Sequence, residues 1–121
     1  MIFKETSLQG AYEIELEIHA DERGFFARSY CAREFEEHGL NPCVVQCNVS
    51  YNRSRGTLRG MHYQEAPAGE AKLIRCARGA LLRIDFDSAD GSLRISGARR
   101  GAGRRGSGAA SSFITGRSHH R

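Results

Sequence analysis

The stretch AYEIELEIHADERG, residues 11–24, decides the fold class expected for this 121-residue chain. Apolar and polar side chains alternate strictly in it, in the order Tyr12, Glu13, Ile14, Glu15, Leu16, Glu17, Ile18 and His19. A period of two predicts a half-buried β-strand, here with an acidic outer face. The residues ADERG that close the stretch predict a turn in which Gly24 is the permissive position.

Further strand and turn patterns follow as far as Leu82. FFARSYC (25–31) predicts a strand, and AREFEEHGL (32–40) predicts one short helix that ends at Gly39, with His38 near its last carbonyls. PCVVQCNVSYN (42–52) alternates again and is followed by a turn (53–56), the extended segment TLRGMHYQ (57–64), a loop, and the strand AKLIRCA (71–77). Short strands with frequent turns predict a mainly β fold, an antiparallel barrel or sandwich with one short helix.

The charge divides the chain into two parts. Residues 1–82 hold 10 basic and 11 acidic side chains, whereas residues 83–121 hold 8 arginines against 3 aspartates. Residues 83–96 could add a strand and a turn, but residues 97–121 consist mostly of Gly, Arg, Ala and Ser. Such a composition buries too little apolar surface to offset the entropy lost on ordering, so a disordered tail is expected there.

The cysteines and the apolar runs predict a cytoplasmic protein. Cys31, Cys43, Cys47 and Cys76 form no C-x-x-C pair, which favours free, buried thiols over a zinc site. No apolar run approaches the roughly 20 residues of a membrane helix. The first residues, MIFKETSLQG, lack the basic and apolar regions of a signal peptide.

His62 is the first candidate for chemistry, within RGTLRGMHYQ (55–64). On its own, a single histidine on an extended segment is either an ordinary polar residue or a catalytic base. Strict alternation would point Arg59 and His62 to opposite faces. A joint site therefore needs a bulge or twist near Gly60, where glycine permits one.

Four motifs in sequence order are similar to one known family: DERGFFARSYC, VVQCNVSYN, RGTLRGMHYQ and EAKLIRCARGAL. Together they resemble the N-terminal half of the dTDP-4-dehydrorhamnose 3,5-epimerases, over about Met1 to Leu81. The resemblance implies an incomplete cupin-type (jelly-roll) barrel. It also implies a homodimer that exchanges N-terminal strands, and a substrate that is a dTDP-linked 4-keto-6-deoxyhexose.

The family reaction, from dTDP-4-dehydro-6-deoxy-D-glucose to dTDP-4-dehydro-L-rhamnose, removes and returns protons on the two carbons beside a ketone. This chemistry needs a base of near-neutral pKa, such as imidazole, and a cation or donor that holds the enolate oxygen. By resemblance, His62 is the base and Lys72 stabilises the enolate. No metal or other cofactor is implied, because HYQ (62–64) places a glutamine where metal-binding cupins have a second histidine.

The resemblance also implies a substrate-binding set, each member of which has an ordinary structural alternative. Arg23 and Arg59 match arginines that hold the diphosphate, for which a forked guanidinium is suited. Gln46 and Asn48 match polar residues lining the sugar-nucleotide site, and Phe26 matches an aromatic residue near the nucleotide. Arg28 stands where some members have an acid that meets the thymidine, so the resemblance supports recognition of the base less strongly than binding of the diphosphate.

After Leu82 the resemblance is expected to end. The chain has no tyrosine after Tyr63 and no acid after Asp90, so the family's general acid and its base-orienting acid are missing. We attribute this to a frameshift near Leu82 or a degraded gene, and expect impaired epimerase activity. Two alternatives are a non-catalytic sugar-nucleotide-binding remnant and a protein that binds RNA weakly through its basic tail.

Overall fold

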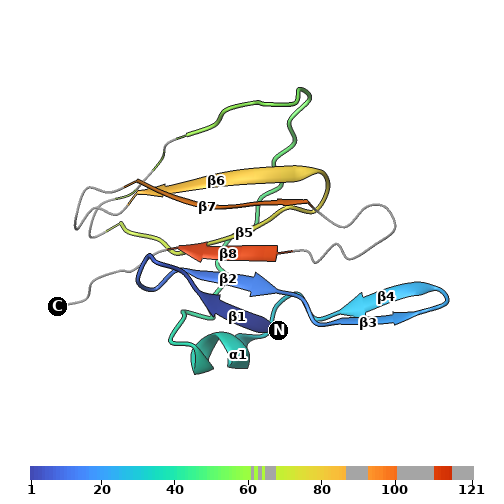
Figure 1. The fold of residues 1–121 in the computed structure, drawn as a ribbon. Coiled ribbons are helices and arrows are strands. Elements are labelled where there is room, and N and C mark those ends of the chain that lie inside the picture. The colour runs from blue at the N-terminus through green and yellow to red at the C-terminus, as the bar shows by residue number, and fades with distance from the viewer. Residues whose placement is uncertain (61, 63, 65–67, 87–92, 101–110, 116–121) are drawn as a thin grey trace.

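A computed structural model shows a mainly β chain with one short helix (Figure 1). It describes residues 1–60, 62, 64, 68–86, 93–100 and 111–115. The elements are β1 (Ile2–Glu5), β2 (Tyr12–Glu15), β3 (Ile18–Asp21), β4 (Gly24–Ala27), α1 (Ala32–Glu37), β5 (Lys72–Arg75), β6 (Ala80–Phe86), β7 (Leu93–Arg100) and β8 (Ser111–Thr115). The predicted class, antiparallel β with one short helix, is confirmed.

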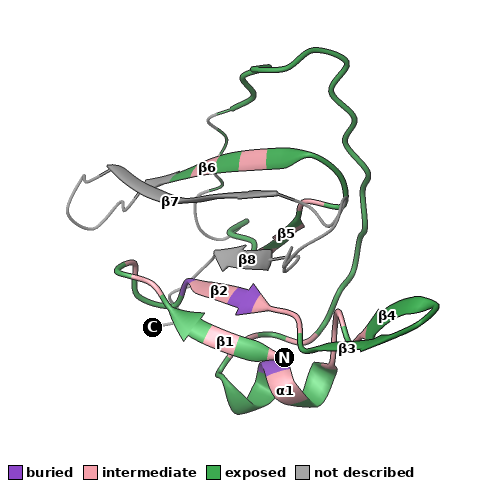
Figure 2. Ribbon diagram, turned by 45° about the vertical axis from the view of Figure 1, so that its right-hand side comes forward, coloured by how far each residue is buried: buried purple, intermediate pink, exposed green. Residues whose placement is uncertain are grey.

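The strands form three antiparallel sheets. The largest has the order β1-β2-β8-β5, so β2 is paired on both sides, with Ile14 opposite Phe3 on β1 and opposite Ser112 on β8. The other two sheets are the hairpins β3–β4 and β6–β7, the second with an irregularity between Leu82 and Arg83. The β3–β4 hairpin projects beyond the four-stranded sheet in both views (Figures 1 and 2).

The core lies where α1 packs against the first hairpin. Among the described residues, the buried apolar side chains are those of Ala11, Ile14 and Phe35 (Figure 2). The Phe3 and Phe35 rings meet edge to face, with centroids 5.7 Å apart. A core this small buries little apolar surface, so the described part of the chain depends heavily on a few side chains.

The helix ends as its sequence predicts. Gly39 has a φ of +69°, which glycine adopts without a steric penalty. Its N–H donates to the Glu36 carbonyl at 2.9 Å, and the N–H of Leu40 donates to the Phe35 carbonyl at 2.9 Å. This double closure, a Schellman motif, satisfies the last carbonyls of α1 and places Leu40 against the core.

The alternating stretch that opened the sequence is two strands and not one. β2 ends at Glu15 and β3 starts at Ile18, and the two belong to different sheets. Ile14 is 1% exposed inside the four-stranded sheet, whereas Ile18 in the hairpin is 40% exposed. The single strand predicted through His19 is therefore wrong, because β3 pairs with β4 and leaves the main sheet.

The strands predicted within residues 42–64 are not found among the described residues. Residues 43–60 contain neither helix nor strand and are exposed throughout. Val45 is 90% exposed and Val49 is 98% exposed, although both lie in the alternating pattern. Alternation only separates two faces, and a strand forms when another strand satisfies its backbone N–H and C=O groups. No described strand pairs with this segment.

The burial of the cysteines differs from expectation, and part of the basic tail forms strands. All four thiols are free, but Cys43 and Cys47 are exposed and Cys31 and Cys76 are half-buried, so the predicted burial is wrong. In the tail, residues 97–100 belong to β7 and residues 111–115 form β8. β8 pairs with β2 on one side and β5 on the other. The remainder of the segment expected to be disordered lies outside the described residues.

Candidate active site

The motif RGTLRGMHYQ turns twice before it reaches His62. Gly56 has a φ of +78°, and the Thr57 hydroxyl donates to the Ser54 carbonyl at 2.8 Å, which confirms the predicted turn. Gly60 has a φ of +104°, so regular alternation is broken at the position where a twist was required. A Cβ at Gly60 would lie 4.0 Å from Nδ1 of His62, which shows that the exposed imidazole lies beside this glycine.

Arg59 is held by its own chain. Its Nε donates to Oδ1 of Asn52 at 2.6 Å, and its Nη2 donates to the Tyr51 carbonyl at 3.3 Å. These bonds tie the two arms of the turn at residues 53–56 together without a strand ladder. The guanidinium remains exposed, so an anion could exchange for these neutral partners.

Lys72 is the first residue of β5, and its surroundings link two of the four motifs. Its Nζ forms an ion pair with Oε1 of Glu70 at 2.8 Å. With its amide nitrogen turned toward this carboxylate, Gln64 donates to Oε1 at 3.0 Å and to Oε2 at 3.2 Å. Glu70 therefore joins the end of the His62 motif to Lys72. Sequence reasoning did not single out Glu70, and its only signal was a charge opposite to that of Lys72 two residues away.

Arg23 lies in the turn of the β3–β4 hairpin. Its Nη2 and Nε donate to Oδ2 of Asp21 at 2.5 Å and 3.1 Å, and its backbone N–H donates to Oδ1 at 2.9 Å. These hydrogen bonds lower the pKa of Asp21. Both side chains are exposed, so the pair holds the guanidinium at the tip of a projecting hairpin.

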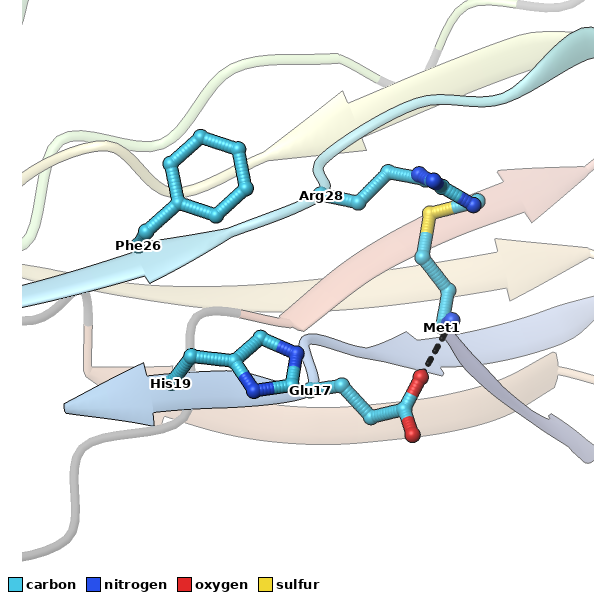
Figure 3. A pocket seen from close by; sticks show the side chains of 5 residues that line it. All are labelled: Met1, Glu17, His19, Phe26 and Arg28. Atoms are coloured by element: carbon cyan, nitrogen blue, oxygen red, sulfur yellow. Dashed lines mark hydrogen bonds and ion pairs between the residues drawn. The ribbon is translucent and has the colours of Figure 1, made fainter.

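Phe26 lines a small pocket of about 170 Å³ beside the N-terminus (Figure 3). His19 is its register partner across the hairpin, and both rings face the pocket, as do Arg28, Glu17 and Met1. Ligand pockets commonly measure roughly 300–1,000 Å³. This one, at about 170 Å³, is smaller than that range.

A charge cluster closes one side of this pocket. The Met1 ammonium donates to Oε2 of Glu34 at 2.8 Å and to Oε2 of Glu17 at 3.0 Å, and Arg28 donates to Oε1 of Glu34 at 2.7 Å. The ammonium and the guanidinium lower the pKa of Glu34 to about 2. Arg28 therefore pairs with an acid on α1, Glu34, and this contact was not evident from the sequence.

The two amides of the binding set, Gln46 and Asn48, lie on the exposed segment 43–60. Between the described residues, no hydrogen bond or ion pair joins any two of the seven predicted site residues, which are Arg23, Phe26, Gln46, Asn48, Arg59, His62 and Lys72. The hairpin that bears Arg23 and Phe26 projects away from the sheet that contains β5 (Figures 1 and 2). The candidate residues thus lie in separate parts of the structure: His62 after the exposed segment 43–60, Lys72 at the start of β5, and Arg23 and Phe26 on the hairpin.

The described residues show neither a metal-binding cluster nor a membrane-spanning helix. No three His, Cys, Asp or Glu side chains there lie close enough to hold a metal ion. In the same residues, no helix is both long and apolar enough to cross a membrane. The expectation that no metal is used stays a prediction.

The architecture defines a class, an antiparallel β protein with one short helix, which presents an exposed imidazole, a half-buried lysine and exposed arginines. Comparison with known proteins identifies the family. Residues 5–98 match the dTDP-4-dehydrorhamnose 3,5-epimerase family, and the chain belongs to it. The match reaches beyond Leu82, where the resemblance was expected to end.

Individual relatives agree with this assignment. The dTDP-4-dehydrorhamnose 3,5-epimerase of Methanothermobacter thermautotrophicus is 44% identical over 86 residues, which are 70% of this chain and 45% of the relative. The enzymes of Streptomyces griseus and Salmonella typhimurium are 41% and 36% identical over 71% and 72% of the chain. The chain spans about half the length of these curated relatives. None of the solved structures matches it.

Proposed function

We propose that this chain contains the base and the enolate-stabilising part of a dTDP-4-dehydrorhamnose 3,5-epimerase site. The reaction is the conversion of dTDP-4-dehydro-6-deoxy-D-glucose to dTDP-4-dehydro-L-rhamnose, in dTDP-rhamnose biosynthesis. The observation that supports the proposal is the family match over residues 5–98, which includes all seven candidate residues. A cytoplasmic location stays a prediction.

In this proposal His62 removes a proton from a carbon beside the ketone, and Lys72 stabilises the enolate oxygen by charge. The contact from Gln64 through Glu70 to Lys72 supports it, because Gln64 follows His62 by two residues. Glu70 then acts as a positioning residue that holds the ammonium near the His62 motif. A bound enolate would compete with Glu70 for the same ammonium group.

Arg23 and Arg59 bind the diphosphate, Phe26 contacts the nucleotide, and Gln46 and Asn48 line the site. In the structure, Arg23 pairs with Asp21, and Arg59 donates to neutral oxygens of Tyr51 and Asn52. These partners are exposed, so a bound diphosphate can replace them. Because the β3–β4 hairpin projects away from β5, we place Arg23 and Phe26 in the site of a second subunit of a homodimer. That arrangement brings both parts of the binding set to one substrate.

The chain by itself is expected to turn over little or no substrate. Two-face epimerisation needs a proton donor opposite the base and an acid that orients the imidazole, and neither is identified among the residues of this chain. The alternative function is therefore binding of the sugar nucleotide without catalysis. The exposed Arg23 and Arg59 favour this alternative, because phosphate binding requires neither missing group.

Calorimetric titration of the chain with dTDP tests diphosphate binding. Charge-assisted hydrogen bonds are worth about 1.5–3 kcal/mol each, so Arg59→Ala and Arg23→Ala should each weaken binding by about tenfold or more. Arg33→Ala is the matched control, since Arg33 is an exposed arginine on α1 that pairs with Glu37. Equal effects of all three substitutions would contradict the proposed diphosphate site.

Catalysis is tested separately by NMR in D₂O with dTDP-4-dehydro-6-deoxy-D-glucose. We expect slow deuterium incorporation beside the ketone, lost in His62→Asn and kept in His120→Asn, with little net epimerised product. Absence of incorporation while dTDP still binds would leave only the non-catalytic alternative. Turnover at the rate of a full-length relative would overturn the expected impairment.

A further inference from the structure

The Glu70 carboxylate has donors on two separate segments of the chain. Its Oε1 accepts from Nζ of Lys72 at 2.8 Å. With the amide of Gln64 oriented to satisfy both its ends, its nitrogen donates to Oε1 and Oε2 of Glu70 at 3.0 Å and 3.2 Å. The backbone approach agrees with these contacts, because a Cβ added at Gly69 would lie 4.0 Å from the Gln64 carbonyl oxygen. Glu70 therefore contacts both the segment that follows His62 and the start of β5.

The backbone holds the two members of the ion pair differently. Lys72 is the first residue of β5 and pairs with Thr115 of β8. Glu70 precedes the strand, and its side chain is 52% exposed, against 40% for Lys72. An exposed ion pair is favoured over its separated charges by a factor of only roughly 1.4 to 5. The carboxylate can therefore be replaced while the backbone of Lys72 stays in the sheet.

We propose that Glu70 binds the ammonium of Lys72 in the substrate complex and is replaced only when the charged enolate forms. The inference rests on the proposed function, which assigns Lys72 to the enolate oxygen, and adds that this contact is absent from the ground state. An ionised carboxylate binds an ammonium more strongly than a neutral carbonyl oxygen does. An enolate oxygen carries a negative charge of its own, so it replaces the carboxylate where the ketone oxygen does not.

This change of partner favours the chemical step over substrate binding. Only an interaction that is stronger in the transition state than in the ground state accelerates the reaction. If Lys72 bound the ketone as firmly as the enolate, the substrate would bind more tightly without reacting faster. The Glu70–Lys72 pair prevents that ground-state contact, and Gln64 holds the displaced carboxylate close to the ammonium.

Glu70→Gln tests this selectivity by calorimetry of the full-length chain with two ligands, dTDP-4-dehydro-6-deoxy-D-glucose and dTDP. The substitution keeps the size of the side chain and removes its charge. The keto sugar nucleotide should bind about twofold to fivefold more tightly, which is the range of an exposed ion pair. The affinity for dTDP, which has no sugar, should change less.

The matched control is Glu37→Gln, which removes the same charge from an exposed pair with Arg33 on α1. It should change neither affinity. An equal gain for both ligands in Glu70→Gln, or no gain for the keto sugar nucleotide, would overturn the proposal.

Deuterium incorporation at saturating substrate gives a second readout, which a purely structural role of Glu70 would not produce. NMR in D₂O should show no faster incorporation in Glu70→Gln, although the substrate binds more tightly, because the gain lies in the ground state. Faster incorporation with unchanged affinity would mean that Glu70 obstructs the enolate, and the proposal would be wrong.

Acetylation of lysine tests the ion pair without any sugar nucleotide. The chain contains two lysines, and each pairs with a glutamate. Lys4 pairs with Glu15 at 2.7 Å and thus serves as an internal reference. With acetic anhydride and peptide mass spectrometry, Glu70→Gln should raise the labelling of Lys72 relative to Lys4 about twofold to fivefold. Glu37→Gln should leave this ratio unchanged.

The two kinds of measurement separate failure of this inference from failure of the proposed function. An unchanged labelling ratio in Glu70→Gln, with both ligands bound, would overturn the inference alone. If neither ligand binds although the ratio rises as expected, the proposed function is wrong and the inference is overturned with it.

Discussion

Residues 12–15 and residues 45–51 both alternate between apolar and polar side chains, yet only the first group is a strand. Ile14 in the first is 1% exposed and Val45 in the second is 90% exposed. The first group has strand partners on both sides, β1 and β8, whereas no described strand pairs with the second. An alternating segment therefore forms a strand only where other parts of the chain complete its backbone hydrogen bonds and cover its apolar side.

The difference between the two regions is tested most directly by removing one apolar side chain from each. Ile14→Ala should destabilise the fold by about 2–5 kcal/mol, because it leaves a cavity beside Phe35 in a very small core. Val45→Ala should have almost no effect in dilute, reduced protein. Urea unfolding followed by circular dichroism measures both. A similar loss in the two variants would show that residues 43–51 are packed in solution.

Hydrogen exchange measures the protection of backbone amides in the same two regions without a mutation. Backbone amides of β2 that donate to β1 or β8 should exchange at least about tenfold more slowly than those of residues 43–52, which have no ladder partner among the described strands. NMR or mass spectrometry of exchanged peptides gives the rates at low protein concentration. Equal protection in both regions would contradict the described pairing.

Two glycines provide a smaller test. Gly39 and Gly60 both have positive φ, but Gly39 closes α1 against the core and Gly60 lies in the exposed segment. Gly39→Ala should therefore lower the free energy of unfolding by about 1 kcal/mol. Gly60→Ala should change it much less, since that segment contributes little to global stability. A larger loss for Gly60→Ala in urea unfolding would reverse this ranking.

The last prediction concerns acid. The pKa of Glu34 is lowered from 4.5 to about 2 by the Met1 ammonium and by Arg28, so its contribution to stability is present above about pH 4.5 and is lost as the pH falls toward 2. Glu34→Gln should remove this part of the acid dependence. Residues 41–52 contain no acid, so they contribute no such change. Thermal unfolding between pH 2 and pH 6 measures the difference between the two proteins.

Part of the candidate site was predictable because its signals are local. A joint site of Arg59 and His62 required a bulge or twist near Gly60, and the φ of +104° at Gly60 breaks the regular alternation there. The roles of His62, Lys72 and the binding residues came from linked motifs and stay predictions. The contacts around them were not predictable: Glu70 between Gln64 and Lys72, and Glu34 beside Arg28, depend on how separate segments fold back.

The amino-acid sequence was enough to predict the β class, the glycine turns and the end of α1. These features depend on φ preferences, side-chain periodicity and residue type, which act over a few neighbouring positions. Only the tertiary structure decided which alternating segment is a strand, and that Ser111–Thr115 in the basic tail lies between β2 and β5. Strand pairing joins residues distant in the chain, and the free energy of a pair depends on a partner that local sequence does not specify.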